Sequence, residues 1–178
     1  VAVGSVGNDE NGMNAGQVRI YDWDGGSWIQ MGQNINGDSA SVFYDIDSIG
    51  GQAGSSLSLS NDGSKLAIGE PFKNHGKVKL FGWNGNLWVQ IGQDINGESY
   101  EDNSGRAISL SSNGSVVAVG AMLNDGNGTD AGHVRIFGSP NSSSCPKPLN
   151  ITILPSVIGD TTILTACDST TWQGNTYT

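Results

Sequence analysis

The sequence predicts an all-β fold built from repeated four-stranded antiparallel modules, and two observations lead to this prediction. The first is a repeat: residues 21–38 read YDWDGGSWIQMGQNINGD, and residues 81–98 read FGWNGNLWVQIGQDINGE. The second is composition, because 27 glycines with only five prolines are typical of many tight turns. Short strands that recur with glycine and tryptophan at fixed places are typical of propeller blades. We therefore predict a partial β-propeller.

Residues 104–138 show the first three strands of the module most clearly. Residues 104–111, SGRAISLS, alternate between two kinds of side chain, as a strand does. Asn113 and Gly114 then predict a two-residue hairpin turn, because both residue types tolerate positive φ. The apolar run VVAVGA at residues 116–121 predicts a strand that is covered on both faces. HVRIFG at residues 133–138 predicts the third strand.

The fourth strand of the module is predicted from SWIQMGQNI, which follows an Asp-Gly turn, and from LWVQIGQDI, which follows an Asn-Gly turn. A tryptophan flanks each turn on both sides, as Trp23 with Trp28 and Trp83 with Trp88. We expect each pair to meet across its hairpin, where such a contact adds ~0.5–1 kcal/mol and fixes the register. Their first role is then structural, and stacking on a ligand is the alternative.

The copies differ in length only where loops are expected. The first copy carries an extra stretch at residues 39–53, and the second shortens a loop to EPFKNHGK. Insertions confined to loops leave the strands of a repeated module intact. We therefore assign residues 1–138 to about two and a half four-stranded antiparallel blades, with blade parts at 1–38, 54–98 and 104–138.

The last copy stops after HVRIFG without a tryptophan hairpin. Either its fourth strand comes from the N-terminal side and closes a ring, or the last repeat is truncated. The Ser- and Pro-rich residues 139–148 are expected to form a linker, and residues 149–178 the start of a short β-rich C-terminal segment. Because the chain opens on VAVG and stops in mid-pattern at GNTYT, we interpret it as a fragment of a longer protein.

The segment SGRAISLSSNGSVVAVGAMLNDGNGTDAGHVRIFG, residues 104–138, resembles the FG-GAP type of repeat, the blade unit of integrin-α-like propellers. It resembles more closely a variant found in secreted bacterial surface proteins. The pattern SGxxxSLSxxGSxxAxG followed by GxVxxFGW recurs in order over residues 1–138. The letters that name the family differ here, since FG is SG or AG, and GAP is GEP or GAM. The resemblance implies a ring of blades that serves binding and cell adhesion outside the cell.

The ending ACDSTTWQGNTYT, residues 166–178, resembles a short Cys-Trp-Gly-Tyr repeat of large surface proteins from gliding, type IX-secreting bacteria. This resemblance implies an extracellular or cell-surface location and a chain that continues past Thr178. The two cysteines, Cys145 and Cys167, lie beyond the repeats. A disulfide between them would close a loop of about 22 residues and contribute ~3 kcal/mol in an oxidising compartment. Whether the two cysteines pair stays open.

Two equivalent loops are the candidate metal sites, NDENGMNAG at residues 8–16 and NDGNGTDAG at residues 124–132. Oxygen-bearing side chains at alternate positions, with a glycine to turn the backbone, suit Ca²⁺ at ~2.3–2.6 Å. The candidate ligands are Asp9, Asn11 and Asn14 and, at the matching positions, Asp125, Asn127 and Asp130. The spacing does not reproduce the acidic run of integrin-type Ca²⁺ loops. Turns held by Asn and Asp side chains alone are the alternative.

Charge and composition argue against several classes of function. The net charge is −9, and the 8 basic residues are scattered, which argues against a nucleic-acid partner. No apolar run approaches the ~20 residues that cross a bilayer, so we expect no membrane insertion. The two histidines, His75 and His133, form no zinc or nucleophile pattern. The closest approach to a sialidase Asp box, at residues 22–28, lacks its serine. We therefore expect no enzyme.

The function that fits these features is a binding or adhesion module of a secreted or cell-surface protein. Its extracellular partner, a carbohydrate or a protein, would meet loops on one rim of the propeller. The insertion at residues 39–53, with Phe43 and Tyr44, is the expected contact element, because function gathers on variable loops. The alternatives are a structural spacer of a large surface protein and a propeller enzyme whose active site lies outside this fragment.

Overall fold

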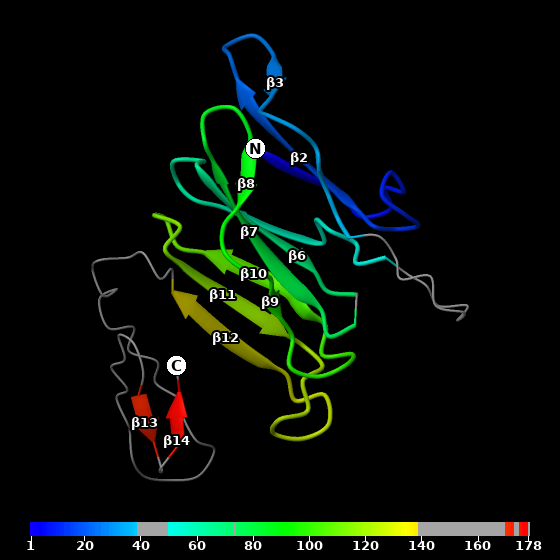
Figure 1. The fold of residues 1–178 in the computed structure, drawn as a ribbon, viewed down its shortest axis with the longest axis vertical. Helices are drawn as coiled ribbons and strands as arrows, with labels where there is room; N and C mark the ends of the chain where they lie inside the picture. The colour runs from blue at the N-terminus through cyan, green and yellow to red at the C-terminus, as the bar shows by residue number, and fades with distance from the viewer. Residues whose placement is uncertain (39–49, 73, 139–169, 173–174, 178) are drawn as a thin grey trace. The chain divides into compact units, whose positions relative to one another are not determined.

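The computed structural model of the chain describes residues 1–38, 50–72, 74–138, 170–172 and 175–177 (Figure 1). The chain divides into two compact units, Val1–Gly138 and Ser139–Thr178. The described residues form strands and turns without a helix, which confirms the predicted all-β fold. The strands lie in separate antiparallel sheets, and none of the described sheets closes on itself, so the ring of blades stays a prediction.

The first module, residues 1–38, contains β1 (Ala2–Ser5), β2 (Gln17–Trp23), β3 (Trp28–Gln30) and β4 (Ile35–Asn36). The sheet order is β1-β2-β3, and β4 also pairs with β2. β3 and β4 follow the same edge of β2 one after the other, so they are two parts of the predicted fourth strand. The first module thus has the second, third and fourth strand positions of the repeat.

The second module contains β5 (Ser56–Leu59), β6 (Lys65–Glu70), β7 (Lys77–Trp83), β8 (Trp88–Gln90) and β9 (Ile95–Asn96). The sheet order is β5-β6-β7-β8, and β9 also pairs with β7. All four predicted strand positions are present, and the fourth strand is interrupted as in the first module.

The third module contains β10 (Ser104–Leu110), β11 (Val116–Ala121) and β12 (His133–Gly138), in that order in the sheet. In the second unit, β13 (Thr170–Trp172) and β14 (Asn175–Tyr177) form a hairpin. Figure 1 shows the three sheets of the first unit one after another, from the blue first module through the green second module to β12.

An apolar layer joins the first module to the second. Val18 and Ile20 of β2 pack in one cluster with Leu66 and Ile68 of β6, and each of these side chains is at most 1% exposed. Full burial of such a side chain stabilises a fold by about 1.5–3 kcal/mol. The two sheets are therefore held face to face mainly by this layer.

A second layer of the same design joins the second module to the third. Val78 of β7 is paired in register with Gly69, just as Val18 is paired with Gly4 in the first module. Val78 packs with Val117 and Val119 of β11, which stand where Leu66 and Ile68 stand in the second module. The repeat therefore reproduces the packing between sheets as well as the strands.

The prediction that residues 116–121 form a strand covered on both faces is wrong for β11, and the strand that is covered in this way is β6. Residues 66–70 of β6 are all buried, because β6 lies between two other sheets. In β11 buried positions alternate with half-buried ones, because only one sheet packs against it among the described residues of the first unit. An apolar strand has the same letters in both situations, so its neighbours decide how far it is covered.

The hairpin between β10 and β11 is longer than the two residues predicted from Asn113 and Gly114. Ser111 N–H donates to Val116 O over 2.8 Å, and Gly114 N–H donates to Ser111 O over 2.8 Å. The loop therefore has four residues between its closing pair, and Gly114 is the fourth residue of its first turn, with φ of 63°. Glycine is favoured at that position of a type I turn, so the same two letters fit a different turn.

The tryptophan pairs lie across their hairpins as predicted. Trp23 is directly opposite Trp28, and Trp83 is directly opposite Trp88. Their ring centroids are 5.2 Å apart in the first pair and 5.5 Å apart in the second, within the range of favourable aromatic contacts. The predicted contact of each pair across its hairpin is confirmed.

Candidate functional site

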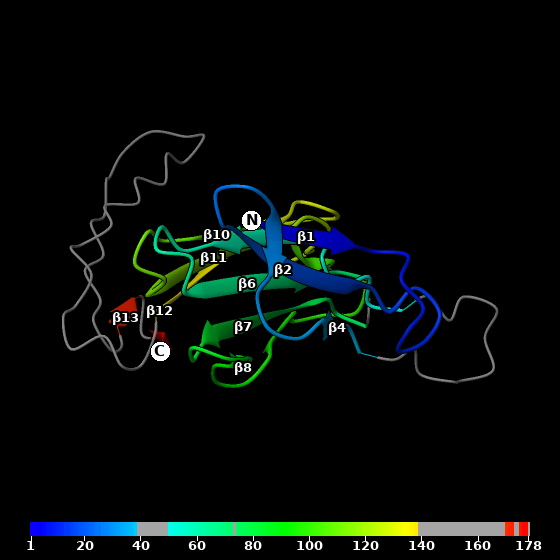
Figure 2. The same cartoon turned by 90° about the horizontal axis from the view of Figure 1, so that it is seen from above.

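The candidate site is the end of the sheets where the long loops lie. The loop between β1 and β2 and the chain that follows β4 leave the first sheet at the same end, on the right in Figure 2. Backbone bonds join these segments, since Gly37 N–H donates to Gly16 O over 2.9 Å and Ala53 N–H donates to Ala15 O over 2.9 Å. In the second module Gly76 and Ser104 make the contact that Gly16 and Ala53 make in the first.

The two candidate metal loops fold alike. Asp9 Oδ1 accepts a hydrogen bond from Asn14 N–H over 2.7 Å, and Asp125 Oδ1 accepts one from Asp130 N–H over 2.8 Å. Each loop is also closed by its last glycine, which donates to an asparagine carbonyl eight residues earlier, over 3.0 Å at Gly16 and 2.9 Å at Gly132. Both carboxylates therefore hold the backbone of their own loop.

Backbone conformation explains a second pair of polar residues. Asn14 has φ of 50° and Asp130 has φ of 53°, in the left-handed region that Asn and Asp adopt more readily than other residues with side chains. The Asn11 amide donates to Gly37 O over 2.7 Å and so ties the loop to the end of β4. Asn127, at the matching position, is exposed.

In each loop one of the three candidate ligands, Asp9 or Asp125, is therefore bonded to a backbone amide. Within the described residues, no three His, Cys, Asp or Glu side chains lie close enough together to hold a metal ion. Phe43, Tyr44, Cys145 and Cys167, the other predicted site residues, lie outside the described residues.

The sequence analysis missed a group of charged side chains at the boundary of the first two modules. Lys77 and Lys79 alternate along β7 and are largely buried. Lys77 Nζ lies 3.0 Å from Asp94 Oδ2, and Lys79 Nζ lies 3.2 Å from Glu70 Oε1, while Asp38 contacts both lysines. The signal that points to this group is a basic residue at alternate positions of the third strand, together with the acid that follows the repeated Ile-Asn-Gly.

Electrostatics within this group favours the charged forms. Burial alone would raise the pKa of Asp38, but hydrogen bonds and charge from Lys77 and Lys79 outweigh it and lower the pKa to about 2. Burial alone would lower the pKa of Lys77, but its contacts with Asp38 and Asp94 and the charge of Glu70 outweigh burial and raise the pKa. The boundary between these modules therefore carries ion pairs at ordinary pH.

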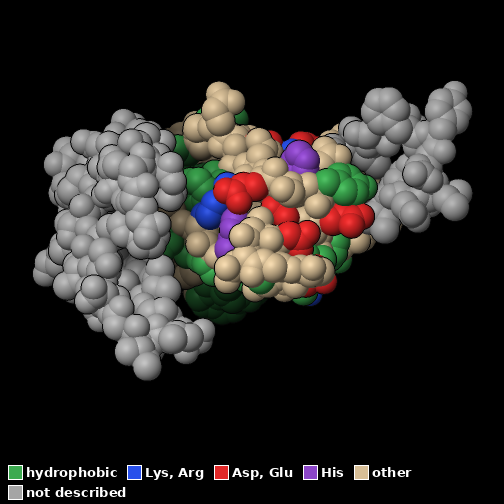
Figure 3. Space-filling view, turned by 90° about the horizontal axis from the view of Figure 1, so that it is seen from below, with side chains coloured by type: hydrophobic (Ala, Val, Ile, Leu, Met, Phe, Trp, Pro, Cys, Tyr) green, Lys and Arg blue, Asp and Glu red, His purple; other side chains and the backbone are tan. Residues whose placement is uncertain are grey.

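The same contact recurs between the second and third modules. Glu98 follows the second Ile-Asn-Gly, residues 95–97, as Asp38 follows the first, residues 35–37. Its carboxylate lies 3.7 Å from His133 Nδ1 and 3.6 Å from Arg135 Nη1, and these two residues stand on β12 where Lys77 and Lys79 stand on β7. Figure 3, seen from below, shows acidic, basic and histidine side chains side by side on this surface.

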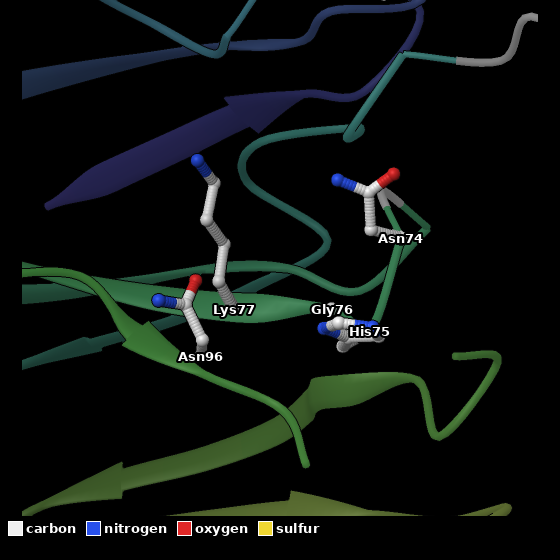
Figure 4. Close-up of a pocket in the computed structure, with 5 residues that line it drawn as sticks. All are labelled: Asn74, His75, Gly76, Lys77 and Asn96. Carbon is white, nitrogen blue, oxygen red and sulfur yellow. The ribbon is translucent and has the colours of Figure 1, made fainter. Parts of the chain in front are cut away.

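A small polar hollow opens beside the charged group, lined by Asn74, His75, Gly76, Lys77 and Asn96 (Figure 4). In Figure 4 the Lys77 side chain extends from β7 toward a strand of the first module, away from His75. Nearby, the buried Asp102 carboxylate accepts bonds from the Asn124 amide and from Ser99 N–H, each over 2.9 Å. These bonds fix the loop that precedes β10 against the loop that follows β11.

Comparisons with known proteins give no family assignment: no family model matches the chain, and no curated protein matches it. Over the part of the chain that the structure describes, we find no helix that could cross a membrane.

Proposed function

We propose that the chain is part of a β-propeller that acts as a binding or adhesion module of a secreted or cell-surface protein. In this proposal the three modules are blades, and the loops at one end of their sheets recognise an extracellular carbohydrate or protein. The FG-GAP-like pattern and the repeated packing between modules support the blade interpretation, and the tail pattern supports the extracellular location.

One observation supports ligand recognition by the loop end of the sheets: the strand pattern is the same from module to module, whereas the loops differ in length. The strands and the packing between modules repeat, whereas the loops that leave this end differ in length from one module to the next. The loops 8–16 and 124–132 are held by their own hydrogen bonds, so they are ordered before a partner arrives. Ordered loops of unequal length on a rigid frame are typical of recognition surfaces.

Calcium belongs to this proposal as a candidate ligand of the loops. In each loop one carboxylate oxygen, Asp9 Oδ1 or Asp125 Oδ1, is already bonded to a backbone amide. A Ca²⁺ ion requires six to eight oxygen ligands, so carbonyl groups and water would have to complete the shell.

A loop graft tests the proposal. We would replace residues 39–52 with the shorter segment SYEDN, residues 99–103, which occupies the matching place after the second module. The graft removes Phe43 and Tyr44 but keeps Asp38 and its contacts with the lysines. The wild-type chain is first screened on a glycan array and a panel of extracellular proteins, and the graft is then tested against the ligand found.

We expect the graft to lose at least ten-fold in affinity, the equivalent of about 1.4 kcal/mol, while its unfolding temperature stays near that of the wild type. Unchanged affinity would show that the insertion is not the contact element. A wild-type chain that binds neither glycans nor proteins would favour the spacer interpretation. Turnover of a bound glycan would contradict the assignment as a non-enzyme.

A further inference from the structure

The outward face of the first module exposes apolar side chains that the repeat buries elsewhere. We call this the leading face and define it by Val1, Val3, Trp23 and Trp28, which are each about half exposed. The matching positions of the second module are occupied by Leu66, Ile68, Trp83 and Trp88. There the first module covers them: Trp88 is 2% exposed, against 54% for Trp28.

The covering of Trp88 is specific as well as apolar. Its indole N–H donates to Met31 O over 3.1 Å, and its backbone N–H donates to Gln33 Oε1 over 3.1 Å. The Gln33 amide donates back to Trp88 O over 2.7 Å. Met31 and Gln33 lie between β3 and β4. The fourth strand of the covering module therefore makes the hydrogen bonds to the tryptophan of the following module. Within the described residues nothing makes these bonds to Trp28.

The leading face is already shaped for such a contact. The Trp23 and Trp28 rings lie 5.2 Å apart with an angle of 58° between their planes, and the covered rings of Trp83 and Trp88 lie 5.5 Å apart at 48°. Since the exposed pair has nearly the geometry of the covered pair, docking requires little rearrangement of the hairpin.

Charge at the leading face fits the same partner. Arg19 stands on β2 opposite Val3, as Lys79 stands opposite Ile68 and Arg135 opposite Val119. Lys79 and Arg135 each contact the acid that follows the fourth strand of the module before. Arg19 is exposed and bonds to Gln17, and within the described residues no carboxylate lies in ion-pair contact with it.

We propose that the leading face binds a complete four-stranded module of the same repeat, joined in the same polypeptide through a strand on the open edge of β1. The acid after the fourth strand of that module would pair with Arg19. β1 has this open edge because, among the described strands, it pairs only with β2, whereas β6 is flanked there by β5.

The partner is a complete module rather than the third module of a second copy. The apolar side chains Val134 and Ile136 of β12 are exposed and could meet the leading face. Within the described residues, however, the third module has no fourth strand, so it offers no counterpart of Met31, Gln33 or Asp38. The third module of a second copy would therefore supply apolar side chains for the contact, but not the hydrogen bonds to Trp28 or the acid for Arg19.

The chain contains the sequence required for the test. Residues 54–116 comprise a complete module, the following first strand and its hairpin turn. A copy of this segment placed ahead of Val1 restores the natural run SVVAVG at the junction. This extended chain is compared with the original chain, and Trp28→Ala and Trp88→Ala are made in both.

We expect tryptophan emission to shift to shorter wavelength in the extended chain. Trp28→Ala should barely change the unfolding midpoint of the original chain, and should lower that of the extended chain about as far as Trp88→Ala does. Arg19→Glu should also lower the midpoint of the extended chain, and exchanging the added copy of Glu98 for arginine should restore it.

Equal, small effects of Trp28→Ala in both chains would overturn the proposal. So would an original chain that dimerises with rising concentration and becomes monomeric on Trp28→Ala, because the occupant would then be a second copy. The outcome is independent of ligand recognition by the loops, since the graft of residues 39–52 leaves every residue of the leading face in place.

Discussion

Single residues in the two equivalent loops show how one carboxylate can hold a turn. Asp9 and Asp125 each accept the amide of the residue five positions later. That residue, Asn14 or Asp130, adopts a left-handed conformation that most side chains disfavour. The oxygen-rich letters of these loops are thus required by the backbone, and the sequence pattern alone does not separate this requirement from metal binding.

Asp125→Ala tests the backbone role. We expect it to lower the free energy of unfolding by about 1 kcal/mol, because Asp130 N–H loses its acceptor. Asp125→Asn keeps an oxygen acceptor at that place, so its free energy of unfolding should stay within about 0.5 kcal/mol of the wild-type value. Urea unfolding of the two variants and the wild type measures the difference.

The same two variants also test for an ion. Urea unfolding is repeated with Ca²⁺ and with a chelator. If Ca²⁺ stabilises the wild type and Asp125→Asn abolishes that gain, the carboxylate charge serves a bound ion. A backbone role alone predicts the same midpoint with Ca²⁺ and with chelator.

The hairpins that carry the tryptophans form a matched pair of elements. Both have the same register and nearly the same ring geometry, and they differ in what covers them. The first module packs on Trp88, while Trp28 faces outward. Local sequence therefore fixes the shape of the hairpin, and the neighbouring sheet determines how much stability it contributes.

Trp88→Ala should destabilise the original chain by about 3–5 kcal/mol, the cost of removing a large buried aromatic side chain. Trp28→Ala removes the same atoms from an exposed site and should cost less than about 1 kcal/mol. Equilibrium urea unfolding of each variant checks the contrast. Similar losses in the two variants would mean that the pairing within a hairpin, rather than cover by the next sheet, stabilises these side chains.

Much of the secondary structure could be predicted from the sequence, because it depends on residues that lie close together in the chain. Period-two alternation predicted the strands, and the repeated letters predicted the opposition of Trp83 and Trp88. The predicted length of the hairpin loop at Asn113 was wrong, because an Asn-Gly pair fits more than one type of turn. The group around Lys77 and Lys79 was missed, because its members come from strands and loops far apart in sequence.

At the scale of the whole first unit, charge and apolar packing act at the same boundaries. The apolar layers hold the sheets face to face, and the acids Asp38 and Glu98 contact the basic residues of the next module beside them. Apolar contact alone is tolerant of sliding between sheets. The ion pairs add a positional constraint, since they form only at one relative position of two neighbouring modules.

This arrangement predicts a loss of stability in acid. Asp38 has a pKa of about 2 in the folded chain, below its ordinary value of 3.8. The contribution of Asp38 to the free energy of unfolding is therefore fully present above about pH 4. It falls as the pH drops toward about 2, because the unfolded chain binds the proton at a higher pH than the folded chain does. Unfolding temperatures measured at a series of pH values between about 2 and 5 give the slope of stability against pH.

Asp38→Asn should flatten this slope and lower stability at neutral pH, because the amide cannot pair with Lys77 and Lys79. Some slope should remain, since Asp62, Asp94 and Asp102 also have a lowered pKa in the folded chain. A variant that keeps the full wild-type slope would show that the boundary ion pairs do not govern the response to acid.

Each contact between modules joins an acid of one module to basic residues of the next, and this placement affects how such a repeat protein can evolve. The complete second module carries bases for the module before it and an acid for the module after it. A gene duplication that begins and ends in the connecting loops therefore copies both halves at once. Each new unit then matches the old ones without further mutation, so the array can grow by whole units while its chemistry stays the same.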